Sequence, residues 1–111
     1  MKSPQNKLIV LCLLFALQCT ESFAMEYHID SQKDFADLSS ATFQSGDLIL
    51  FKRGVRFAGM FSPSGKGTGK APIRIEAYGQ GKRPRIDALG KSKAGLMLRN
   101  PAFWEVSGLE I

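Results

Sequence analysis

Cysteine, histidine and long apolar runs are scarce in this chain, and each scarcity excludes a class of structure or site. The 111 residues contain two cysteines, Cys12 and Cys19, and one histidine, His28. Both cysteines precede residue 25, so the rest of the chain has no disulfide and no cysteine metal site. We assign His28 no role, because a lone histidine is more often structural or solvated than catalytic.

The longest apolar run covers only residues 8–17, whereas a membrane span needs about 20 apolar residues. A short basic start precedes this run, and the small residues Ser22 and Ala24 follow it. This order predicts a signal peptide over residues 1–24, cleaved after Ala24, and a secreted or periplasmic protein. Cys19 raises a lipoprotein alternative, which the glutamine before it disfavours.

The charge of the chain is basic, with 15 lysines and arginines against 10 acidic residues, a formal net charge of +5. Cleavage would remove two lysines and one glutamate, which changes the charge from +5 to +4. In a secreted protein this excess favours an acidic polysaccharide as partner over nucleic acid. A charge of this size is also ordinary for a soluble domain. We expect no nucleic-acid partner, and no membrane association after cleavage.

Short apolar strands recur about every two dozen residues between Gly46 and Ile111. Three apolar pairs follow this spacing: Ile49 with Phe51, Ile73 with Ile75, and Leu96 with Leu98. A fixed period with apolar positions in phase predicts a solenoid, in which each repeat forms one turn of chain.

The same register places outward-facing charges in columns. One column would set Glu76 between Lys52 and Arg99, and parallel neighbours about 4.8 Å apart would each contribute about 0.2–1 kcal/mol. A second column would stack Asp87 on Glu110. We interpret that pair as solvated like charges at the surface, with a cation site as the alternative.

A short amphipathic helix is predicted before the repeats. Ser31, followed three residues later by Asp34, is typical of a helix N-terminus, where a side-chain oxygen accepts a bond from a free backbone N–H. Phe35 and Leu38 share one face at helical spacing, and residues 41–43 are a candidate extension. We expect this helix to cover the open apolar end of the first coil.

The stretch 62–72 is rich in glycine and proline and is predicted to be a loop. It contains Gly69-Lys70, which prompts comparison with a phosphate-binding P-loop. That motif needs glycine where Ser64 stands and serine or threonine where Ala71 stands, so we reject it.

Three stretches carry a resemblance to a known superfamily: Gly46–Gly54, Ala71–Gly79 continuing to Arg83–Ile86, and Asn100–Ile111. Together they resemble the N-terminal coils of the right-handed parallel β-helix superfamily of pectate lyase-like, chondroitinase-B-like and alginate lyases. The resemblance covers nearly all of the chain after residue 24. It implies an all-β fold, with a strand and capping helix in residues 25–45 and two to three incomplete coils of a β-helix in 46–111.

The resemblance also implies activity on an acidic polysaccharide, as a polysaccharide lyase or a glycoside hydrolase. In this family a lysine or arginine base removes the proton α to a uronate carboxylate, and cations stabilise the charge that develops. These groups usually lie on later coils, and no residue of this chain matches a catalytic motif. No cofactor is evident, although calcium occurs in the family. We therefore expect an N-terminal fragment that is inactive alone and self-associates through its open C-terminal coil.

Two alternatives remain open. One is a non-catalytic β-helix segment of a surface protein or adhesin. The other is a small secreted carbohydrate-binding module, for which Trp104, Arg83 and Arg85 are the candidate binding residues, because aromatic faces suit sugar rings and cations suit acidic groups.

Overall fold

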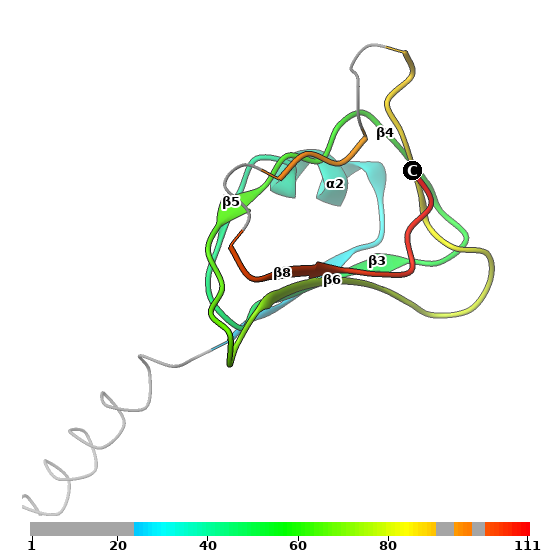
Figure 1. Cartoon of the computed structure of the whole chain (residues 1–111). Coiled ribbons are helices and arrows are strands. Elements are labelled where there is room, and N and C mark those ends of the chain that lie inside the picture. The colour runs from blue at the N-terminus through cyan, green and yellow to red at the C-terminus, as the bar shows by residue number, and fades with distance from the viewer. Residues whose placement is uncertain (1–23, 91–94, 99–101) are drawn as a thin grey trace, which may run out of the picture.

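Alternation of apolar and polar residues builds the longest strand of the chain. In the computed structural model, which describes residues 24–90, 95–98 and 102–111, Ile73 and Ile75 are fully buried and Arg74 between them is exposed. The elements are β1 (Glu26–Ile29), α2 (Gln32–Leu38), β2 (Thr42–Phe43), β3 (Leu48–Lys52), β4 (Arg56–Ala58), β5 (Ser64–Gly65), β6 (Ile73–Tyr78), β7 (Arg85–Asp87) and β8 (Trp104–Val106) (Figure 1).

The strands form three parallel sheets, with strand orders β1-β3-β6-β8, β2-β5 and β4-β7. The chain visits them in turn: it passes from β3 through β4 and β5 to β6, and then through β7 to β8. In Figure 1 the strands and their connections trace a roughly three-sided outline around the core. The described part of the chain is thus mostly β, with parallel sheets and one short helix.

The pairing register differs from the predicted period. Ile49 pairs with Ile75, 26 residues later, and Ile73 pairs with Trp104, 31 residues later. Leu96 forms an isolated bridge with Phe61 instead of following Ile73, so its predicted pairing was wrong. Each strand keeps its alternation of buried and exposed residues, but the connections between strands differ in length. The spacing between paired strands is therefore less regular than a fixed period predicts.

The predicted charge columns change with the register. Glu76 lies beside Leu50, and Lys52 lies beside Tyr78. Arg99 is outside the described residues. Asp87 and Glu110 are not stacked, because Glu110 forms its bridge with Arg85.

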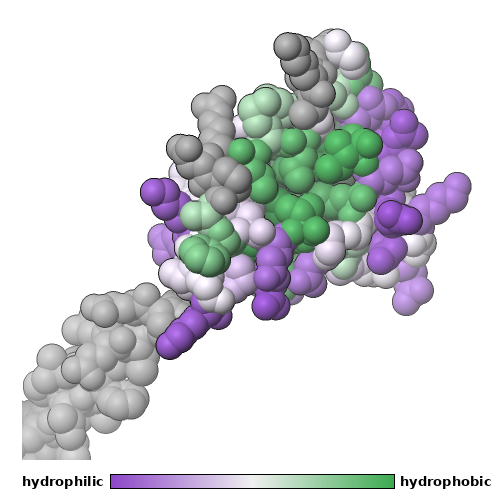
Figure 2. Space-filling model, viewed as in Figure 1, coloured by the Kyte–Doolittle hydropathy of each residue, from purple (hydrophilic) through white to green (hydrophobic). Residues whose placement is uncertain are grey.

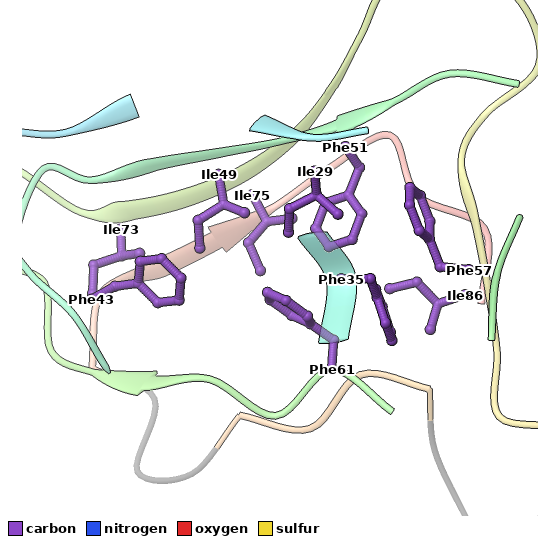
Figure 3. Packing of buried hydrophobic residues seen from close by; sticks show 10 residues of the cluster. All are labelled: Ile29, Phe35, Phe43, Ile49, Phe51, Phe57, Phe61, Ile73, Ile75 and Ile86. Atoms are coloured by element: carbon purple, nitrogen blue, oxygen red, sulfur yellow. The ribbon is translucent and has the colours of Figure 1, made fainter. Parts of the chain in front are cut away.

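The core is a single cluster of isoleucine and phenylalanine side chains from α2 and the three sheets (Figure 3). Its members are Ile29, Phe35, Phe43, Ile49, Phe51, Phe57, Phe61, Ile73, Ile75 and Ile86. Phe35 enters from α2 and stacks on Phe57 with ring centroids 5.4 Å apart and an interplanar angle of 14°. It also contacts Phe61, at 5.5 Å between centroids. The helix therefore supplies a side chain that packs against both Phe57 and Phe61 in the core.

The predicted start of the helix is confirmed, because the Asp34 N–H donates to the Ser31 hydroxyl oxygen at 3.2 Å. The predicted extension over residues 41–43 is wrong, since Thr42 and Phe43 form β2. Their partner is β5, within the stretch predicted as a loop. A β-branched and an aromatic residue favour a strand here, and burial of Phe43 fixes it.

One helix side chain also completes the edge of a sheet. The Gln32 amide donates to the Ala58 carbonyl oxygen at 2.8 Å and accepts from the Ala58 N–H at 2.9 Å. Ala58 ends β4, an outer strand of its sheet, so Gln32 satisfies backbone groups that a further strand would otherwise pair. The helix thus packs Phe35 onto the core and pairs Gln32 with the edge of the β4-β7 sheet.

No helix within the described part of the chain is long and apolar enough to cross a membrane. The apolar run of residues 8–17 and the signal peptide predicted over 1–24 fall almost wholly outside the described residues. Both the signal peptide and secretion stay predictions.

Replacing Phe35 with alanine should reveal how much the fold depends on the helix. We expect the free energy of unfolding to fall by about 3–5 kcal/mol, because the change removes a ring buried against three others. Denaturant unfolding followed by circular dichroism measures this. The control is Phe103→Ala, whose ring is 59% exposed, and an equal loss in both variants would contradict the role assigned to Phe35.

Candidate functional site

Two turns lie one above the other at the corner between the β3-β6 sheet and the β4-β7 sheet. The first connects β3 to β4 through Gly54, and the second connects β6 to β7. The Arg53 N–H donates to the Tyr78 carbonyl at 2.9 Å, and the Gly54 N–H donates to the Lys82 carbonyl at 2.8 Å. Gly54 has a φ of +82°, which glycine adopts with little strain. Backbone hydrogen bonds therefore hold the second turn directly over the first.

These turns gather basic side chains into what we call the basic corner. Its members are Lys52, Arg53, Arg56, Lys82, Arg83 and Arg85, of which all but the half-buried Arg53 are exposed. Four of them line a shallow pocket of about 310 Å³, together with Gly54, Val55 and the acidic Glu110.

Asp87 and Glu110 lie beside these cations and partly offset their charge. Asp87 forms an ion pair with Arg56. The Leu89 N–H, which donates to Asp87 at 2.8 Å, and the Arg56 guanidinium together lower the pKa of Asp87, so this carboxylate stays ionised at neutral pH. Among the residues that the structure describes, no carboxylate forms an ion pair with Lys82, Arg83 or Arg85. The corner keeps an excess of positive charge.

Trp104 lies apart from the two arginines with which the sequence grouped it. Its indole N–H donates to the Gly65 carbonyl at 2.9 Å, and its ring meets Phe43 edge-on at 6.4 Å. Its backbone partner is the buried Ile73, so the side chain shares the inner face of the sheet. Trp104 packs on the core, whereas Arg83 and Arg85 line the basic pocket.

Sequence reasoning missed the contribution of the first turn. Lys52 ends β3, Arg53 follows it and Arg56 begins β4. One turn of chain later, Lys82 and Arg83 follow β6 and Arg85 begins β7. A repeated Lys-Arg pair, with a further arginine two or three residues on, was the available signal.

A second polar cluster lies on the outer face of the first sheet. The Tyr78 hydroxyl donates a hydrogen bond to Asp30, and the His28 ring meets Tyr78 edge-on at 4.8 Å. His28 also lies 3.2 Å from a carboxylate oxygen of Glu26. The bond to Asp30, followed by desolvation and the nearby negative charge, raises the pKa of Tyr78 to about 12.

Absorbance titration of the tyrosines should detect this interaction. We expect one phenol to ionise near pH 12, and replacement of Asp30 by asparagine to bring its pKa back toward 10.0. Because the folded pKa is raised, the stabilisation from this bond is present below pH 10 and disappears as the pH rises through about 12. Tyr78→Phe assigns the transition, and a transition near 12 that survives in Tyr78→Phe would refute the assignment.

In neither cluster are the side chains arranged to hold a metal ion. Within residues 24–90, 95–98 and 102–111, no group of three or more histidine, cysteine, aspartate or glutamate side chains is placed to hold a metal ion. The expected stack of Asp87 and Glu110 does not form. These residues do not fit the calcium that the resemblance suggests, and we derive no step through it.

Comparisons of this chain with protein-family models, with curated proteins and with solved structures found no match.

Proposed function

We propose that this chain forms the opening coils of a right-handed parallel β-helix in a secreted protein that acts on an acidic polysaccharide. The observation that carries the proposal is the basic corner, which presents six cationic side chains on two stacked turns and on the strand ends beside them. Exposed cations at close spacing attract a polyanion and raise its local concentration. In a lyase-like reaction the same charges would bind uronate carboxylates.

The path of the chain supports the β-helix. In Figure 1 it advances from β1 and the faint α2, which lie farther away, to β8 in front. Along this path it turns anticlockwise toward the viewer, which is the right-handed sense favoured by crossover connections between parallel strands. Each turn adds one strand to the sheet β1-β3-β6-β8. In a solenoid, each turn of the chain likewise adds one strand to the same sheet.

We assign catalysis to no residue of this chain. The basic corner can hold and orient an acidic sugar, but no described side chain is assigned the proton transfer that β-elimination needs. We propose that the catalytic groups belong to further coils of the parent protein. The same pocket also suits the second candidate function, a small carbohydrate-binding module, since binding needs no catalytic group.

Binding to acidic polysaccharide tests the proposal directly. We expect isothermal titration of the purified chain with polygalacturonate to give saturable binding that weakens with added salt, and dextran to give none, because dextran carries no charge. Absence of binding to any acidic polysaccharide at low salt would overturn the proposed partner. Release of unsaturated oligosaccharides by the chain alone would overturn the assignment of catalysis to other coils.

At the end of the core opposite α2, the described residues leave apolar side chains exposed. Figure 2 shows a continuous hydrophobic area on the face nearest the viewer, bordered on either side by hydrophilic residues. Trp104 and Val106 of β8 lie directly over the buried Ile73 and Ile75, yet Val106 is 40% exposed and Ile111 is 63% exposed. β8 is also an outer strand of its sheet. An apolar layer beside a free strand edge can be covered by a second copy of the chain, and we propose self-association here.

A charge on the uncovered face should reduce this association. We expect Val106→Lys to shift the chain from oligomer to monomer in light scattering, because the lysine would have to be buried between copies. Met25→Lys is the matched control: Met25 is 47% exposed and precedes β1, the opposite outer strand of the same sheet. Equal dissociation by both variants, or a monomeric parent chain, would contradict association through β8.

A further inference from the structure

We infer that the basic corner is a charge ladder, which binds a linear polyanion lying along the direction in which the coils stack. This inference rests on the proposed function and specifies how the acidic polysaccharide is held. It concerns which residues touch the polymer and how the polymer runs across them.

The ladder has two levels with the same pattern. Arg56 and Arg85 are direct partners in the parallel pair β4-β7, so the guanidinium groups start from neighbouring strands about 4.8 Å apart. Arg53 and the Lys82-Arg83 pair occupy the two turns that the backbone bonds hold together, and Lys52 ends β3 just before the first turn. Each level therefore adds three cations, and the cations repeat along the stacking direction.

Stability does not explain this arrangement. Like charges directly opposite one another on adjacent strands destabilise a sheet. Asp87 compensates Arg56, and Glu110 lies beside Arg85 in the sheet and lines the same pocket, but Lys82 and Arg83 form no ion pair with any described carboxylate. An anion bound along the corner would remove the repulsion, so the arrangement is suited to a ligand.

The corner is also accessible and suited to a polymer. No atom lies within 4 Å of the position where a side chain at Gly54 or Gly79 would start, so ligand groups can approach both turns. The pocket of about 310 Å³ is at the lower limit of ordinary ligand pockets. It takes one part of a ligand, and a longer chain can continue over the adjacent cations.

The lining residues favour a polysaccharide over single-stranded nucleic acid. Binding of unpaired bases relies on aromatic side chains on which they stack. The pocket is lined by Gly54, Val55, Arg56, Lys82, Arg83, Arg85 and Glu110, none of which is aromatic. The pocket can therefore recognise a ligand by its negative charges and their spacing, which suits carboxylated or sulfated sugars.

The test measures the affinity of the chain for oligogalacturonates of increasing length, by isothermal titration at low salt. We expect affinity to rise at least tenfold from the monomer to oligomers long enough to reach both levels. Lys82→Glu with Arg83→Glu should weaken binding of the long oligomer at least tenfold and reduce its salt dependence. If charge reversal impairs folding, the double variant Lys82→Gln with Arg83→Gln removes the same two charges without reversing them and tests the same loss of binding.

The control has the same change in charge elsewhere on the molecule. Lys66→Glu with Lys70→Glu alters two exposed lysines outside the corner pocket, and we expect binding to stay within twofold. Equal loss in both double variants, or affinity independent of oligomer length, would overturn the ladder while leaving polysaccharide binding standing. No binding by the parent chain would overturn the proposed function itself. Complete displacement by single-stranded DNA at equal charge concentration would overturn the choice of polysaccharide.

Discussion

Burial of one continuous column of isoleucine and phenylalanine side chains is the constraint on which the rest of the structure depends. Ile49, Ile73 and Ile75 are fully buried on the inner faces of neighbouring parallel strands. The ring of Phe35 packs against Phe57 and Phe61 on the other sides of the core. Because side chains alternate along a strand, fixing the inner face also fixes which residues face solvent. The positions of the turns follow from the ends of these strands, and so do the positions of the basic side chains.

The magnitudes show why the basic corner is tolerated. Full burial of an isoleucine or phenylalanine contributes about 1.5–3 kcal/mol, whereas an unfavourable cross-strand charge pair costs about 0.2–1 kcal/mol. The corner joins strands that carry Phe51, Phe57 and Ile86, all buried in the core. Packing of these residues outweighs the repulsion of the arginines beside them. The fold can therefore hold like charges together at the surface.

Local patterns in the sequence predicted local structure well, and long-range spacing poorly. Ser31 with Asp34 marked the helix, because a cap depends on atoms three residues apart. Alternation identified Ile73 and Ile75 as core residues even though their predicted partners were wrong. The connections vary in length without disturbing either pattern, so no period read from the sequence reveals that Trp104 follows Ile73. Arg83 and Arg85 were recognised as candidates, but the contribution of Arg56 appears only once β4 and β7 are paired.

The two ends of the core differ along the direction in which the strands stack: one end is covered and the other is accessible. At one end α2 covers the core, and Gln32 satisfies the backbone of Ala58. At the other end Val106 lies over Ile75 and remains accessible, beside an outer strand. The cations of the corner repeat along the same direction, because the hydrogen bonds that join the strands also hold the two turns together. A strand added beside β8 would cover the apolar layer, and a Lys-Arg turn after that strand would lengthen the basic corner. One stacking direction would therefore extend both the apolar core and the row of basic side chains.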